Sequence, residues 1–220
     1  MPLMNEITQP PVQGPPAPYA ATGPTLPSTG KRILRIAGAV LVTALAVTGG
    51  RLAMEALLDD GPADAGRYEL VPPASFQGLA LQESGPRVDA VKQGQGTPKK
   101  GTVPVAVVYA DQAGTAQLVV SGAAGRFGDE DPGAALTGTL TSMGIKEADV
   151  TEHEAGKPDG GSMRCGTLAL EGSSLPLCVW ADHSSLVTVT VPVENGPVAI
   201  DVLAERARAL REVMEVPAAS

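Results

Sequence analysis

The chain has 220 residues, enough for one ordinary domain of roughly 100–150 residues plus accessory segments. Charged residues make up 18% of it and aromatic residues 3%, and it holds 26 glycines and 20 prolines. No Gly-x-y repeat is present, which excludes a collagen-like protein, and 43% apolar residues in short valine-rich runs exclude a chain that is disordered throughout. The formal net charge of −8 excludes the basic character of nucleic-acid-binding proteins, so we expect no nucleic-acid partner.

An apolar run near the N-terminus indicates contact with a membrane. Residues 36–50 carry no charge and, as a helix, would cover roughly 22 Å of a hydrocarbon core about 30 Å thick. Residues 33–52 add Arg35 and Arg51 near the two ends, from where their side chains reach the lipid headgroups. Good helix formers continue to Leu58. We therefore expect a transmembrane helix over residues 33–58, with the lipid bilayer as its partner.

The charges around this run predict its orientation. Basic residues precede it and acidic residues follow it: Lys31, Arg32 and Arg35 on one side, and Glu55, Asp59 and Asp60 on the other. Because basic residues stay inside the cell, we expect a single-pass protein of the cell membrane with a cytoplasmic N-terminus and the C-terminal domain outside. A cleaved signal peptide is one alternative, since residues 44–46 have the small-x-small form of a cleavage site, and it would give a secreted soluble domain. A buried core helix is the other.

The segments on either side of the run differ in composition. Residues 1–32 are proline-rich and poor in charged and aromatic residues, which predicts a disordered cytoplasmic tail. Residues 59–101 form a linker and packing arm. Within it, residues 67–81 are apolar enough to lie against the domain as an arm or edge strand, and the Pro72-Pro73 pair excludes a central strand. Residues 82–101 turn to glycine, glutamine, lysine and proline, and we expect them to be flexible.

The folded extracytoplasmic domain is expected over residues 102–216. Strand patterns cover residues 102–110, 116–122, 149–154, 164–170, 176–181 and 186–192. One helix is expected from Asp131, an N-cap ahead of Pro132, to Gly144. A second runs from Asn195 to about Glu215. Short connections between successive strands favour an antiparallel sheet, so the predicted fold class is α+β with about two helices.

Cys165 and Cys178 are the only cysteines, and they lie on opposite arms of a predicted hairpin. In an exported domain we expect a disulfide between them, which stabilises by roughly 3 kcal/mol on chain-entropy grounds. A reduced, buried pair is the alternative. Trp180 follows Cys178 by two residues and shares its strand face, so we expect the indole to pack beside the sulfurs.

Few residues have the types that metal binding or catalysis needs. The candidate zinc ligands are Cys165, Cys178, His153 and His183. Their spacing fits no compact zinc-binding pattern, and oxidation would compete for the thiols. We therefore expect no metal, no other cofactor and no cofactor-binding residue.

Asp182, His183 and Ser184 are the residue types of a hydrolytic triad in one predicted turn. Consecutive side chains point apart, however, and a relay needs groups that converge from different parts of the chain. We therefore assign no catalytic residue. This turn and the nearby tryptophan are instead a candidate contact surface made of Trp180, Asp182 and His183.

The C-terminal half carries a Gly-Gly-x-x-x-Cys-Gly … Cys-x-Trp-Ala-Asp-His pattern, and a Tyr-x-Leu-x-Pro-Pro arm precedes it. Its residues are Gly160, Gly161, Cys165, Gly166, Cys178, Trp180, Ala181, Asp182 and His183. With this pattern, residues 68–191 resemble uncharacterised, membrane-anchored proteins of high-GC, Streptomyces-like actinobacteria. Residues 184–186 read Ser-Ser-Leu where that group would have threonine and glycine. The resemblance implies location and fold, and it implies no activity.

These observations together predict a membrane-anchored extracytoplasmic domain that binds an envelope protein or a ligand, or serves as an envelope accessory module. An enzyme is the less favoured class. The competing hypothesis in that class is an envelope hydrolase that uses His183 or His153.

Overall fold

The computed structural model describes residues 65–128 and 131–219. The tail expected over residues 1–32 and the transmembrane helix expected over residues 33–58 lie outside the described residues. Within the described ranges, no helix combines the length and the apolar character that crossing a membrane requires.

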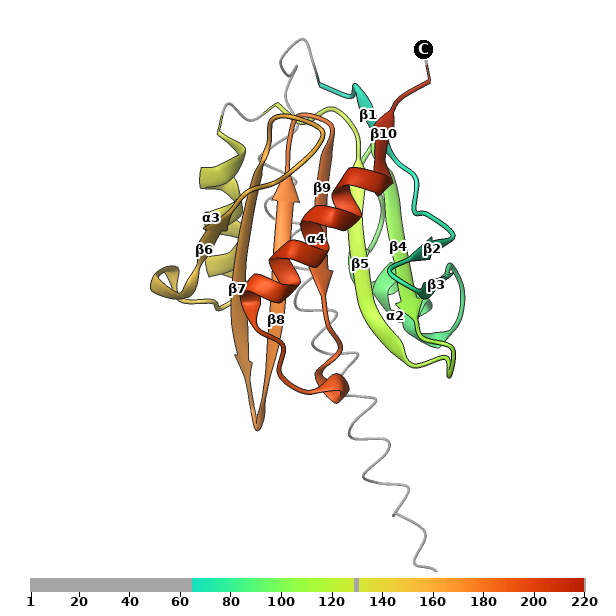
Figure 1. Ribbon diagram of the computed structural model, residues 1–220. Coiled ribbons are helices and arrows are strands. Elements are labelled where there is room, and N and C mark those ends of the chain that lie inside the picture. The colour runs from blue at the N-terminus through green and yellow to red at the C-terminus, as the bar shows by residue number, and fades with distance from the viewer. Residues whose placement is uncertain (1–64, 129–130, 220) are drawn as a thin grey trace, which may run out of the picture.

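The described chain folds into strands with three α-helices (Figure 1). The strands are β1 (Tyr68–Leu70), β2 (Ser75–Phe76), β3 (Leu79–Gln82), β4 (Val103–Ala110), β5 (Ala116–Ala124), β6 (Thr151–His153), β7 (Ser162–Leu170), β8 (Ser173–Ala181), β9 (Ser185–Thr190) and β10 (Glu215–Pro217). The helices are α2 (Pro86–Gln95), α3 (Pro132–Ser142) and α4 (Ile200–Met214), with short 3₁₀ turns η1 (Glu147–Asp149) and η2 (Val193–Asn195). This confirms the α+β class.

Eight of these strands form one sheet in the order β2-β3-β4-β5-β9-β8-β7-β6, and every neighbouring pair in it is antiparallel. The antiparallel sheet expected from the short connections is therefore confirmed. A separate two-stranded sheet joins β1 to β10. It pairs the first described strand of the chain with the last one.

Helices cover both faces of the large sheet. In Figure 1, α4 crosses the front of the sheet, and α2 and α3 lie behind it. Alternation along the strands explains this arrangement. On β4, Val107 packs in the cluster that contains Leu203 of α4, whereas Val108 packs with Val88 of α2. On β8, Trp180 belongs to the α4 side, and the alternate positions face α3.

The apolar arm expected over residues 67–81 does lie against the domain. It supplies β1, β2 and β3, and β3 pairs with β4. The hydroxyl of Tyr109 donates to the carbonyl of Pro73 over 3.1 Å, and the ring of Phe76 packs at 5.9 Å from that of Tyr109. Since neither proline lies in a strand, the arm is interrupted where the Pro72-Pro73 pair predicts.

The flexible linker expected over residues 82–101 is wrong for residues 86–95, which form α2. Two small signals mark this helix in the sequence. Pro86 stands at its first turn, where proline is tolerated, and Val88 and Val91 have helical spacing and are both buried. The side-chain Nε2 of Gln95 donates to the carbonyls of Val105 and Gly122. Only two apolar side chains of α2 are buried, so the amino-acid composition of residues 86–95 is that of a linker.

The other two helices were expected; α3 begins where it was expected, and the second helix begins later. Asp131 caps α3 by accepting from the amide of Ala134 over 3.1 Å, as its N-cap position predicts. The second helix begins at Ile200 rather than Asn195, because residues 193–195 form η2 instead. The domain thus has three α-helices where about two were expected.

Candidate functional site

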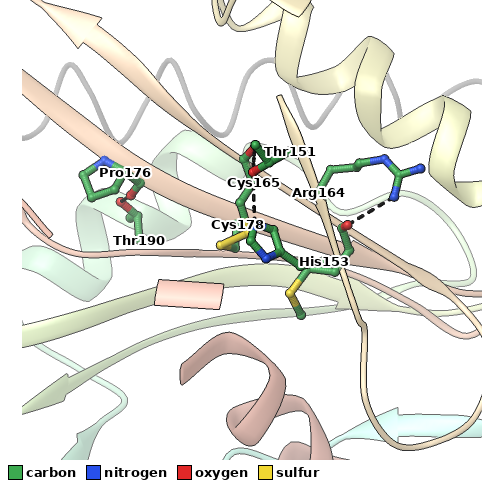
Figure 2. The surroundings of a disulfide bond; sticks show 8 residues. Thr151, His153, Arg164, Cys165, Pro176, Cys178 and Thr190 are labelled. Carbon is green, nitrogen blue, oxygen red and sulfur yellow. Dashed lines mark hydrogen bonds between the residues drawn. A yellow bond between two sulfur atoms is a disulfide. The ribbon is translucent and has the colours of Figure 1, made fainter. Parts of the chain in front are cut away.

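Cys165 and Cys178 form the expected disulfide, and it bridges two neighbouring strands (Figure 2). The two residues are direct partners in the β7–β8 register, with Cα atoms 4.1 Å apart. Both side chains are fully buried in the core on the α4 side. Neither thiol is available to a metal or a substrate.

Trp180 lies in the same core cluster as the two cysteines, as its position on the strand predicts. It is 0% exposed, and its indole Nε1 donates to the hydroxyl of Ser185 over 3.1 Å. The structure therefore places Trp180 in the core and removes it from the candidate contact surface, because a side chain without exposure cannot meet a partner.

The two histidines stand apart in the fold. His153 lies on the edge strand β6, where its Nε2 is 2.9 Å from the hydroxyl of Thr151 (Figure 2). His183 lies in the β8–β9 turn and is half-buried. Its carbonyl accepts hydrogen bonds from the amides of Gly66 and Phe127, each over 3.1 Å. This carbonyl ties the start of the described chain to the turn.

Asp182 is engaged away from the neighbouring histidine. Its Oδ1 accepts from the amides of Ser184 and Ser185 over 2.6 and 2.7 Å, which shapes the turn. Its Oδ2 accepts from Nη2 of Arg211 over 2.7 Å. Asp182, the acidic residue of this turn, thus holds the backbone of the turn and an arginine.

Arg211 is the centre of a buried polar cluster that sequence reasoning missed. Its side chain is 0% exposed, although it is charged. Nε donates to Oε2 of Glu215 over 2.6 Å, one helical turn away. Nη1 donates to the carbonyls of Ala155 and Gly160 over 3.2 and 3.1 Å, so the loop before β7 lies over the guanidinium.

Ser185 and Glu215 complete this cluster, which we call the Arg211 cluster and which consists of Trp180, Asp182, Ser185, Arg211 and Glu215. Ser185 donates to Oε1 of Glu215 over 2.8 Å and accepts from Trp180. In the part of the chain that the structure describes, no buried side-chain nitrogen or oxygen lacks a hydrogen-bond partner. Such a fully connected network positions the elements that contribute to it.

Burial gives the cluster an unusual charge state. One guanidinium faces two carboxyl groups, so full ionisation would leave a net negative charge away from water. Burial, together with the neighbouring Asp182 carboxylate, raises the pKa of Glu215 to about 8, although Arg211 and Ser185 act in the opposite direction. The raised pKa of Glu215 therefore favours its protonated form, in which the cluster is close to electrically neutral.

Gly161 allows the loop before β7 to lie close to Arg211 and to the end of β8. Its φ is +81°, and a Cβ there would lie 2.7 Å from the carbonyl of Ala181 and 3.1 Å from Nη2 of Arg211. The adjacent motif glycine, Gly160, has different surroundings, because a Cβ there would meet nothing within 4 Å. The motif glycine that the cluster needs is Gly161.

The sequence did contain one signal for Arg211. It lies between Leu210 and Met214 on the apolar stripe of α4, where a charged residue at a core position needs a partner. Glu215 follows at the i+4 position that places a carboxylate beside it. No group of three or more histidine, cysteine, aspartate or glutamate side chains is placed to bind a metal within residues 65–128 and 131–219.

None of the protein-family models, curated proteins or solved structures compared with this chain matches it.

Proposed function

We propose that this chain is a single-pass membrane protein whose C-terminal domain lies outside the cytoplasm and binds an envelope protein or a ligand, or serves as an envelope accessory module. The proposal includes the disordered tail, the transmembrane helix over residues 33–58 and the likeness to the actinobacterial proteins. It assigns no catalytic residue.

The disulfide is the observation that carries this proposal. Cytoplasmic thiols are kept reduced, and structural disulfides belong to oxidising compartments. The Cys165–Cys178 bond is buried between two paired strands, and no other cysteine competes for either partner. The charge asymmetry around residues 36–50 supports the same orientation.

Two features support a binding or accessory function over hydrolysis. Asp182 is committed to the backbone of its own turn and to Arg211, and His153 lies on the edge strand β6, whereas the turn connects the interior strands β8 and β9. The contact surface proposed here is accordingly reduced to Asp182 and His183, the half-buried residues of the β8–β9 turn.

Topology is tested with single cysteines at exposed positions, because the native pair is buried and oxidised. The variant Gln112→Cys places a cysteine in the exposed β4–β5 turn, and the variant Ser28→Cys places one in the predicted tail. We expect a membrane-impermeant maleimide to label Gln112→Cys on intact cells and Ser28→Cys only after lysis. The reverse pattern would place the domain in the cytoplasm and end the proposal, and recovery of unanchored protein from the medium would favour the secreted form.

A further inference from the structure

Glu215 belongs to two structures at once. It is a member of the Arg211 cluster, and it is also the first residue of β10. In β10 it lies directly opposite Leu70 of β1. Glu215 therefore connects the buried cluster to the strand that pairs with the N-terminal arm.

The N-terminal arm, here residues 65–71, depends on β10 and the β8–β9 turn for its backbone hydrogen bonds. Val71 donates to the carbonyl of Met214 over 2.8 Å, and Ala218 donates to the carbonyl of Arg67 over 2.8 Å. Gly66 donates to the carbonyl of His183. If β10 leaves the cluster, β1 loses the one strand that pairs with it within residues 65–128 and 131–219.

The large sheet and α4 are held together by contacts other than this pairing, although Leu70 of β1 packs in the same core cluster. β1 and β10 form their own sheet, separate from the eight-stranded one. α4 is anchored independently, because Leu203, Ala207 and Leu210 are fully buried against the large sheet. The arm and β10 can thus open while the core stays folded, as local structural units commonly do.

The charged groups around Glu215 come from each element packed against it. α4 supplies Arg211, and the β8–β9 turn supplies Asp182 and the half-buried His183. The loop before β7 supplies the carbonyls of Ala155 and Gly160, which face Arg211. On β1, the charged side chains of Arg67 and Glu69 are exposed. Arg211 donates to both buried carboxyl groups and so balances part of their charge.

We propose that Glu215 is a proton-dependent latch: when it carries a proton, the Arg211 cluster holds β10 and the N-terminal arm closed, and when the proton is lost, β10 and β1 separate from the domain. The O–H bond of the Glu215 carboxyl group breaks, the proton leaves to water, and no other covalent bond changes.

The direction of the pH effect follows from the two protonation states. In the opened state Glu215 is in water, where its pKa is near 4.5, and in the closed state the pKa is raised to about 8. Between these values the closed state binds one more proton, so each unit of pH favours opening by up to tenfold. From pH 6 to pH 8 the opened population is expected to rise roughly 50-fold and then to level off.

Opening would lengthen the connection between the folded domain and the segment that precedes residue 65. Seven released residues add up to about 23 Å of extended chain. This consequence rests on the proposed membrane attachment, whereas the latch itself does not. The topology test and the latch test can therefore fail separately.

The test is amide hydrogen exchange of the full chain between pH 5 and pH 9, corrected for intrinsic exchange rates. The reporters of arm opening are the amide of Val71 on the arm and the amide of Ala218, which follows β10 and donates to Arg67 of the arm, with amides in the β4–β5 pairing as the reference for global unfolding. We expect the arm amides to exchange through an opening more frequent than global unfolding, with the roughly 50-fold rise from pH 6 to pH 8.

Two variants complete the test. Glu215→Gln keeps the shape but cannot ionise, so the pH dependence of arm opening should disappear, while the exposed Glu69→Gln on β1 should keep it. The proposal is overturned if the wild-type arm amides exchange only as rarely as the β4–β5 amides. It is also overturned if their opening does not depend on pH. Because these two outcomes are read on the wild type, the test stands even if Glu215→Gln does not fold.

Discussion

Arg211 and Glu215 lie one helical turn apart, and their side chains meet over 2.6 Å with no exposure to solvent. The pair spans the end of α4 and the start of β10. With Asp182 from the β8–β9 turn, it joins the last helix, the last strand and the centre of the sheet. A charged group in this position stabilises the fold only while all its partners are present.

Removal of the guanidinium is the most direct test of this dependence. Arg211→Met fills much of the space but leaves two buried carboxyl groups without their cation. We expect the free energy of unfolding to fall by about 3–5 kcal/mol, measured by urea denaturation at pH 7.

Arg208→Met is the matched control on the same helix. Arg208 is partly exposed and pairs over 3.6 Å with Glu154, which is 90% exposed. Exposed pairs of this kind contribute about 1 kcal/mol or less. Equal losses in the two variants would show that the Arg211 cluster has no special part in stability.

The pH dependence of global stability is a second prediction. Because the folded state raises the pKa of Glu215 from 4.5 to about 8, the folded chain binds the extra proton in that interval. The stabilisation is complete below about pH 4.5 and is lost as the pH rises to about 8, with a slope of about 1.4 kcal/mol per pH unit at most.

Denaturant titrations at several pH values measure this slope. Glu215→Gln should flatten it, since a glutamine does not titrate, and Glu212→Gln should not, because Glu212 is exposed on the same helix. A slope that survives in Glu215→Gln would assign the proton to another group.

Much of the fold could be predicted because its signals are local. In β9, Val187 and Val189 alternate with Thr188, and the valines are the fully buried residues. Asp131 next to Pro132 marked the start of α3 in the same way. By contrast, α2 was missed because two valines in a polar segment are too weak a pattern to separate a helix from a linker.

The Arg211 cluster could not be predicted as a unit because its members are far apart in the chain. Asp182 and Arg211 are separated by 29 positions, and Ser185 and Glu215 by 30. Only the pairing of strands and the placement of α4 across them bring these groups together. The sequence predicted Asp182 as part of a turn, and the structure shows that Asp182 also accepts a hydrogen bond from the buried Arg211.

Loss of the disulfide gives a third prediction. The double variant Cys165→Ala, Cys178→Ala removes a cross-link between residues 13 positions apart. We expect it to fold and to lose about 3 kcal/mol of unfolding free energy, because the unfolded chain gains conformational freedom. Under reducing conditions the wild type should approach the double variant, whereas the variant itself should be unaffected. A wild type that resists the loss under full, verified reduction would contradict this assignment.

The two adjacent motif glycines allow a sharply controlled fourth prediction. Gly160 and Gly161 both have positive φ, +89° and +81°, so alanine at either position costs about 1–2 kcal/mol in backbone strain. Only at Gly161 does the new Cβ also collide, with the carbonyl of Ala181 at 2.7 Å and with the side chain of Asp182 at 2.9 Å. We therefore expect Gly161→Ala to be destabilised by about 2–5 kcal/mol, more than Gly160→Ala, in the same urea titration. Since the backbone term is shared, the difference between the two variants measures how tightly the loop must close over Arg211. Equal costs would mean that this loop can move away without disturbing the cluster.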